Sequence, residues 1–138
     1  MTIEAVPDAL LKSAALAREN AYAPYSKFAV GAAVESGNGK IYSGCNVENA
    51  AYGLTNCAER TAIFNAVSCG ESDLVRILVL ADTAEPIAPC GACRQVMWEF
   101  NIQEVILCNM AGSYKVFGLS ELLPYAFGSE AMERGRRE

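Results

Sequence analysis

Histidine is absent from the 138-residue sequence, and this absence removes several kinds of active site. A metal site with imidazole ligands, a Ser-His-Asp triad and a Cys-His nucleophile pair all need histidine. Any zinc ion must therefore bind to cysteine sulfur or to carboxylate oxygen. Six cysteines and 16 acidic residues are available for that purpose.

Positive charge is also scarce. The formal net charge is −5, which argues against a sequence-independent grip on nucleic acid, because such binding needs a basic face. The one basic run, RGRR at residues 134–137, lies in a polar terminus that we expect to be solvated. The partner expected from this charge balance is a small molecule rather than a polymer.

Long apolar runs and an amino-terminal targeting segment are missing as well. No stretch approaches the length of a membrane span, and no charged segment at the amino terminus precedes a short apolar one. We therefore expect no membrane association and a cytoplasmic location. In the cytosol, cysteines are more often metal ligands, catalytic groups or buried thiols than disulfides.

The chain is predicted to form a single domain over residues 1–138, with a polar tail from about residue 130. Its length suits one compact domain, and 52% of its residues are apolar, which argues against disorder. No linker, repeat or low-complexity tract divides the sequence. A second catalytic domain has no room in this length.

Hydrophobic periodicity and turn residues predict helices and strands in the order α-β-β-α-β-α-β-β-α. Helices are expected at about residues 8–21, 58–67, 92–100 and 120–123, and strands at 28–34, 40–45, 74–80, 104–108 and 114–117. Gly37-Asn38-Gly39 is a turn that makes the first two strands a hairpin. The β-α-β-α-β middle implies parallel strands with right-handed crossovers. The predicted fold class is therefore α/β, a three-layer α/β/α sandwich with a mixed five-stranded sheet.

Two short cysteine segments, each at the start of a predicted helix, form a candidate zinc site. One contains Cys57, and the other contains Cys90 and Cys93 in a Pro-Cys-x-x-Cys run. A three-residue step brings side chains to one face of a helix, and the sulfurs of a zinc site lie about 3.8 Å apart. Cys90 and Cys93 can therefore share one ion, and Cys57 can supply the third sulfur. The positive helix starts favour thiolate over thiol.

Glu59 and Arg60 follow Cys57 closely, and each has a chemical role beside such an ion. Glu59 is the predicted proton shuttle. Because residues two apart in a helix do not face each other, Cys57 must have non-helical dihedral angles for both side chains to converge. Arg60 is placed to donate to the sulfurs and offset their negative charge. The alternatives are a carboxylate that favours a helix start for Glu59 and a surface arginine for Arg60.

The cysteines also allow two other interpretations. A Cys-x-x-Cys pair occurs in thioredoxin-like redox proteins, but there it follows a strand near the chain start, and it would leave the Cys57 segment unexplained. A structural zinc site needs a fourth protein ligand from Cys45, Cys69 or Cys108, none of which has Cys-x-x-Cys spacing. Three ligands with an open fourth position are typical of a catalytic zinc site.

A cysteine, a glutamate two residues later and then Pro-Cys-x-x-Cys is the arrangement found in zinc deaminases. Over about residues 8–130, the chain resembles the small homo-tetrameric cytidine deaminases. The resemblance is carried by residues 21–28 (AYAPYSKF), 44–52 (GCNVENAAY), 56–62 (NCAERTA), 89–95 (PCGACRQ) and 121–127 (ELLPYAF). The first two stretches concern the substrate, so they separate this family from other zinc deaminases better than the metal motif does.

The resemblance implies a substrate role for several matching residues. Phe28 would pack against the pyrimidine, and backbone groups near Ala58 would contact the base. Asn46 and Glu48 would hydrogen-bond the ribose 3′-hydroxyl. These roles suit the chemistry, because a flat base favours an aromatic face, and a hydroxyl can both donate and accept.

The resemblance also implies an assembly and a reaction. Tyr52 and Phe127 would reach the site of a neighbouring subunit in a homotetramer. With one Zn²⁺ per chain, the enzyme would hydrolyse cytidine and 2′-deoxycytidine to the uridine forms and ammonia, as in pyrimidine salvage. Glu59 would move a proton from water to ring N3 and later to the leaving amine. Blasticidin-type and other small-molecule zinc deaminases are the nearest alternatives, and the Asn46 and Glu48 motif argues against them.

Overall fold

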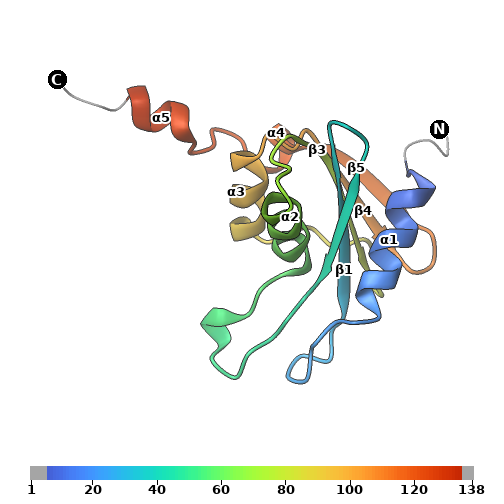
Figure 1. The fold of residues 1–138 in the computed structure, drawn as a ribbon. Helices are drawn as coiled ribbons and strands as arrows, with labels where there is room; N and C mark the ends of the chain where they lie inside the picture. Colours follow the sequence, from blue (N-terminus) through green and yellow to red (C-terminus); the bar gives the residue numbers. More distant parts are fainter. Residues whose placement is uncertain (1–5, 135–138) are drawn as a thin grey trace.

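The chain folds around a five-stranded sheet that carries helices on both faces (Figure 1). The computed structural model describes residues 6–134. The helices are α1 (Asp8–Arg18), α2 (Ala58–Ser68), α3 (Gly91–Glu99), α4 (Leu119–Leu122) and α5 (Ser129–Arg134), with a 3-10 turn, η2 (Tyr52–Leu54), before α2. The strands are β1 (Val30–Ser36), β2 (Ile41–Cys45), β3 (Leu74–Ala81), β4 (Glu104–Asn109) and β5 (Tyr114–Gly118).

The strands follow the order β2-β1-β3-β4-β5 across the sheet. β3 and β4 pair in parallel, and the other neighbours pair antiparallel. β2 and β3 are both antiparallel to the strand between them, so β2, β3 and β4 point the same way. The mixed five-stranded sheet and the α/β class are therefore confirmed. The parallel arrangement expected for the middle of the chain is also present, although β1 separates β2 from β3.

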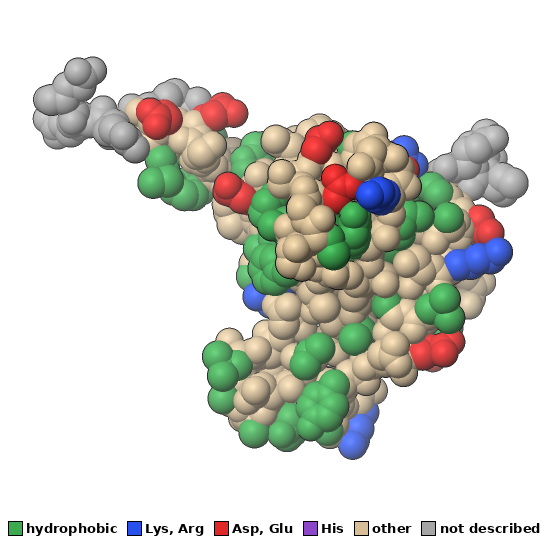
Figure 2. Space-filling view, in the orientation of Figure 1, with side chains coloured by type: hydrophobic (Ala, Val, Ile, Leu, Met, Phe, Trp, Pro, Cys, Tyr) green, Lys and Arg blue, Asp and Glu red, His purple; other side chains and the backbone are tan. Residues whose placement is uncertain are grey.

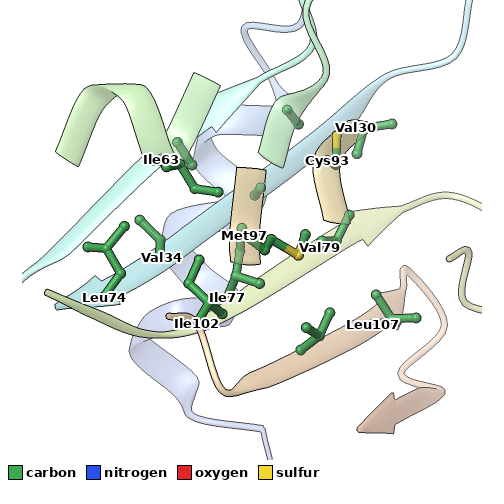
Figure 3. Packing of buried hydrophobic residues seen from close by; sticks show 14 of the residues in the cluster. Val30, Val34, Ile63, Leu74, Ile77, Val79, Cys93, Met97, Ile102 and Leu107 are labelled. Atoms are coloured by element: carbon green, nitrogen blue, oxygen red, sulfur yellow. The ribbon is translucent and has the colours of Figure 1, made fainter. Parts of the chain in front are cut away.

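Each face of the sheet has its own apolar core, because successive residues of a strand point to opposite faces. α1 covers one face, where Leu10 packs with Leu78 of β3 and Ile106 of β4. α2 and α3 cover the other face in a larger cluster (Figure 3). Cys93 of α3 is fully buried in that cluster, so one of the predicted zinc ligands is anchored by the main core.

Gly44 allows α2 to approach β2 closely. A Cβ atom on Gly44 would lie 2.5 Å from the backbone nitrogen of Ala62, well inside contact distance. Gly31 has the same function under α1, where a Cβ atom would lie 2.1 Å from the carbonyl oxygen of Ala14. Glycine at position 44 therefore fixes the distance between the sheet and α2, the helix that starts directly after Cys57.

Several boundaries differ from the sequence predictions. β1 begins at Val30 rather than at residue 28, because Lys27 has a left-handed φ of 61° and the Val30 N–H donates to the side chain of Asn46. α1 ends at Arg18, and residues 19–21 form a turn. The tail expected from residue 130 contains α5, and η2 was not predicted. Residues 135–137 of the basic run lie outside the described residues.

No helix within residues 6–134 is both long enough and apolar enough to cross a membrane.

Replacing Gly44 with alanine should lower the free energy of unfolding by about 1–3 kcal/mol, because the new methyl group meets helix backbone that must move. Urea unfolding at a fixed protein concentration measures the change. Gly53→Ala is the matched control, since a Cβ there has no described atom within 4 Å, and it should change stability by less than about 0.5 kcal/mol. Equal stability of the two variants would show that α2 can shift without cost.

Candidate active site

The starts of α2 and α3 carry the three cysteines that were predicted to bind zinc. Cys57 directly precedes α2 with φ −72° and ψ 155°, and Cys90 directly precedes α3 with φ −69° and ψ 167°. Cys57 therefore has the extended backbone that the two-residue step to Glu59 requires. In the described part of the chain, neither helix start has a side-chain cap. The first N–H groups, with their positive partial charge, are thus available to thiolates and to a ligand.

The three sulfur atoms form a cluster of the right size for one zinc ion. The Sγ atom of Cys90 lies 3.9 Å from that of Cys57 and 3.5 Å from that of Cys93, and all three lie within 4.8 Å of one another. Tetrahedral zinc with Zn–S bonds of ~2.3 Å separates its sulfurs by about 3.8 Å. Within residues 6–134, this is the one group of three or more possible ligand side chains close enough to hold a metal.

The other three cysteines lie outside this cluster. Cys108 belongs to the core under α1, where burial raises the pKa of its thiol to about 11. Burial also raises the pKa of Cys45 at the end of β2, and Cys69 is exposed after α2. A fourth cysteine ligand, which a structural zinc site would need, is therefore not found among the residues that the structure describes.

Arg60 reaches from α2 to the sulfur cluster. Its Nη2 donates to the Sγ atom of Cys57 at 3.2 Å, and its Nε is buried without a hydrogen bond to any described residue. A hydrogen bond from the Cys93 thiol, together with Arg60, lowers the pKa of Cys57 to about 5. The same hydrogen bond and burial raise the pKa of Cys93. Cys57 is thus a thiolate at neutral pH, and a metal ion would displace the remaining thiol protons.

Glu59 lies in the first turn of α2 with 5% of its surface exposed. Burial raises the pKa of its carboxyl group, and the negative charge of Cys57 raises it further. A carboxyl group with a raised pKa can take up and release a proton close to neutral pH, as general acid–base chemistry requires.

A pocket of about 230 Å³ lies over the sulfur cluster and Glu59. Phe28, Val30 and Ile87 contribute apolar surface to its lining, and Ala58 lines it at the start of α2. An aromatic ring on one side and helix N–H groups on the other suit a flat heteroaromatic ligand with a polar edge.

Asn46 lines the same pocket and holds the backbone around Phe28. Its Oδ1 accepts the N–H of Val30 at 2.9 Å, and its Nδ2 donates to the carbonyl of Phe28 at 2.7 Å. The backbone carbonyl of Asn46 also accepts the N–H of Tyr22 at 3.0 Å. Asn46 therefore fixes the position of Phe28 in addition to any contact with a ligand.

Glu48 joins this pocket to a second depression of about 290 Å³, which Tyr25 and Tyr52 also line. The Glu48 carboxylate accepts the backbone N–H groups of Tyr25 and Ser26 and the hydroxyl of Ser26. The bonds from Ser26 lower the pKa of Glu48, so the group is ionised. Tyr52 is 75% exposed and meets Tyr25 edge-on, with 6.1 Å between ring centroids.

Phe127 is not among the described residues that line either depression. Its side chain is 61% exposed, and its carbonyl accepts a hydrogen bond of 2.8 Å from Gln95. The chain continues from Phe127 into α5, which projects from the body of the fold (Figure 1). The structure thus gathers the other predicted site residues around one site and leaves Phe127 apart from it.

Sequence reasoning missed five residues that line the pocket, namely Ser26, Val30, Thr55, Ile87 and Ala88. Ser26 had a usable signal, because it lies in the stretch that carries Phe28. Ile87 had none, since it is one apolar residue in a loop between two prolines. Its contribution depends on where that loop meets the start of α2.

Comparisons with known proteins agree with this geometry. Residues 6–109 match the family model described as "Cytidine and deoxycytidylate deaminase zinc-binding region". The cytidine deaminase of Halalkalibacterium halodurans is 54% identical over 125 residues, which cover 89% of this chain and 95% of that protein. A crystal structure of cytidine deaminase from Burkholderia pseudomallei superimposes with a TM-score of 0.83 at 53% identity, covering 92% of this chain and 100% of the other. The cytidine deaminase of Mycobacterium tuberculosis gives a TM-score of 0.75 at 39% identity over 88% of this chain and 96% of the other.

The fold and the three-sulfur site together define a zinc-binding deaminase domain. The chain belongs to the cytidine and deoxycytidylate deaminase family.

Cys57→Ala, Cys90→Ala and Cys93→Ala should each lose the zinc ion, because each variant keeps only two of the three sulfur ligands. Elemental analysis of the purified variants measures zinc per chain. Cys69→Ala is the matched control, since Cys69 is exposed and lies outside the cluster, and it should retain one zinc ion. Full zinc content in Cys93→Ala would overturn the ligand assignment.

Proposed function

We propose that this chain is a zinc-dependent cytidine deaminase, which hydrolyses cytidine and 2′-deoxycytidine to uridine and 2′-deoxyuridine with release of ammonia. The observation that carries the proposal is the cluster of three cysteine sulfurs beside the buried Glu59, under a pocket with an aromatic wall. The names of relatives at 54% and 53% identity support the same reaction. Such an activity returns free nucleosides to pyrimidine salvage.

In this proposal, the pocket binds the base between Phe28 and the start of α2. The ring of Phe28 packs against the pyrimidine face, and the N–H groups that begin at Ala58 hydrogen-bond the polar edge of the base. Ile87 contributes apolar surface to the same lining. Water is thereby excluded from the ring, which strengthens each hydrogen bond around it.

Asn46 and Glu48 meet the ribose 3′-hydroxyl in the proposed complex. The Glu48 carboxylate is ionised and already accepts hydrogen bonds from Ser26. Two carboxylate oxygens offer about four acceptor positions, so Glu48 can also accept from a hydroxyl. The hydrogen bond from Asn46 to the carbonyl of Phe28 fixes the residue that contacts the sugar relative to the residue that contacts the base.

The proposed reaction adds water to C4 of the base and removes the amino group. Glu59 takes a proton from the attacking water and passes it to ring N3. The same carboxyl group then carries the second water proton to the amine, which leaves as ammonia, and C4 keeps the oxygen as a carbonyl. Burial of Glu59 suits both transfers, because its raised pKa lets it hold a proton between them.

The chain holds one zinc ion through Cys57, Cys90 and Cys93 in this proposal. When bound, zinc supplies a Lewis acid that lowers the pKa of water toward neutrality. Three thiolates bring more negative charge than the ion neutralises. The hydrogen bond from Arg60 to Cys57 offsets part of that excess.

We further infer a cytoplasmic homotetramer with shared active sites, in which Tyr52 and Phe127 reach a neighbouring subunit. Tyr52, Leu54 and Phe127 are more than half exposed, which suits an interface. Hydrophobic side chains gather on the lower lobe in Figure 2, whereas Lys and Arg side chains are scattered singly on that face. The exposed hydrophobic side chains favour self-association. The net charge of −5 favours a free nucleoside over nucleic acid as the substrate.

Glu59→Gln should keep its zinc but lose turnover by about 10²–10⁴-fold, because the amide can bind substrate but cannot shuttle a proton. The fall in cytidine absorbance follows the reaction, and the variant should still bind cytidine. Glu19→Gln, at an exposed position after α1, is the control for the same chemical change and should keep wild-type turnover. A near-normal kcat in Glu59→Gln would reduce Glu59 to a carboxylate that favours a helix start.

Mixed oligomers test whether Phe127 acts in the site of another subunit. When Phe127→Ala and Glu59→Ala chains are co-expressed, a Phe127→Ala chain keeps its own Glu59 and can receive Phe127 from its partner. Activity at low cytidine concentration should therefore exceed that of either parent. If Phe127 acted within its own chain, no mixed site would be complete and activity would stay low. Sizing of each parent first checks that both assemble, and a fully active monomer would contradict shared sites outright.

A further inference from the structure

Arg94, the residue after the third cysteine, joins two distant segments of the chain. Its Nε donates to the carbonyl of Pro89 at 2.9 Å, and its Nη1 donates to the carbonyl of Leu122 at 2.7 Å. Pro89 directly precedes Cys90, so the guanidinium reaches back over the start of its own helix. Leu122 is the last residue of α4. One side chain thus ties the loop that presents Cys90 to the beginning of the carboxy-terminal segment.

Gln95, the next residue, holds the same carboxy-terminal segment further along. Its Nε2 donates to the carbonyl of Phe127 at 2.8 Å. Three residues later on α3, Trp98 packs under Gly128, where a Cβ atom would lie 2.9 Å from the indole Nε1. Gln95 and Trp98 lie on one face of α3, because residues three apart in a helix are neighbours. Residues 122–128 therefore follow that face of the helix.

The hydrogen bonds of Arg94 and Gln95 connect the loop that carries Cys90 with the segment that carries Phe127. Cys93 is fully buried in the main core, so α3 is a fixed base for the two residues that follow this cysteine, Arg94 and Gln95. The backbone of Phe127 is therefore tied to α3, while its ring stays exposed.

We propose that Arg94 and Gln95 are positioning residues, which hold the Cys90 loop and the Phe127 segment in one fixed arrangement. Arg94 acts on zinc retention by fixing the carbonyl of Pro89. Gln95 acts on substrate affinity by fixing the backbone that presents Phe127. The substrate part of this inference rests on the proposed deaminase function, whereas the zinc part does not.

The chemistry of each side chain suggests a nearly isosteric test. Lysine keeps the charge of Arg94 but lacks the planar fork that reaches two carbonyl groups at once. Glutamate keeps the shape of Gln95 but has no proton to donate, so it cannot bond the Phe127 carbonyl. Arg76 and Gln103 are matched controls for the two changes. Arg76 pairs with Glu35 and Glu104 at the surface, and the side chain of Gln103 donates to the carbonyl of Asn101, two residues away.

The first experiment measures the rate of zinc release from the full-length zinc-loaded protein to a chelating dye. Arg94→Lys should release zinc about 10-fold or more faster than wild type, the usual effect of removing a group that orients a metal ligand. Arg76→Lys should release it at the wild-type rate. Release from Arg94→Lys at the wild-type rate, in a protein with a normal thermal transition, would overturn the role of Arg94.

The second experiment separates KM from kcat with cytidine as substrate. Gln95→Glu should raise KM about tenfold with nearly unchanged kcat and zinc content, because the released Phe127 segment contributes to substrate binding but moves no proton. Gln103→Glu should match wild type. A loss in kcat with unchanged KM would mean that Gln95 only stabilises the fold, and would overturn its positioning role.

The two readouts keep the possible failures distinct. An inactive wild-type protein that holds zinc would contradict the proposed function, while the zinc-release comparison would still decide the role of Arg94. An active wild type whose variants match their controls would contradict this inference alone. If Arg94→Lys did not fold, Gln95→Glu would decide whether α3 positions the carboxy-terminal segment.

Discussion

Three cysteine sulfurs must meet within the span of one zinc ion, and the topology of the sheet makes this possible. β2 leads toward α2 and β3 leads toward α3. Both strands are antiparallel to β1, so they point the same way and their connections leave the same edge of the sheet. The two helices therefore begin near each other, and their positive ends both favour thiolate. Gly44 under α2 and the buried Cys93 in α3 then set the distance of each helix from the sheet.

The electrostatic design follows from this sulfur cluster. The cluster is negative, and a buried carboxyl group next to it resists ionisation, so the position of Glu59 raises its pKa. Arg60 works in the opposite direction by donating to Cys57, which keeps the thiolate stable. A proton carrier and a charge-balancing cation thus occupy consecutive positions of one helix turn. The run Cys-Ala-Glu-Arg at residues 57–60 places both groups directly after the zinc ligand Cys57.

The metal site could be predicted from sequence because its determinants are local. Helix starts, a three-residue step and a missing histidine restrict the ligands without knowledge of the whole fold. The start of β1 could not be predicted in this way, because the side chain that bonds Val30 belongs to Asn46, sixteen residues away. The pocket role of Ile87 and the direction of the Phe127 segment likewise depend on contacts between distant parts of the chain. The order of helices and strands along the chain needed only short-range patterns, whereas η2 and α5 are too short to show a periodic apolar stripe.

X-ray absorption at the zinc edge shows directly whether the bound ion has three sulfur ligands and one position open to a lighter atom. We expect three sulfur neighbours at ~2.3 Å and one lighter neighbour, oxygen or nitrogen, at about 2.0 Å. Soaking with a pyrimidine nucleoside should alter the lighter neighbour and leave the three sulfurs in place. Four sulfur neighbours would indicate a closed structural site and would rule out a catalytic zinc ion, as would a protein that binds no zinc at all.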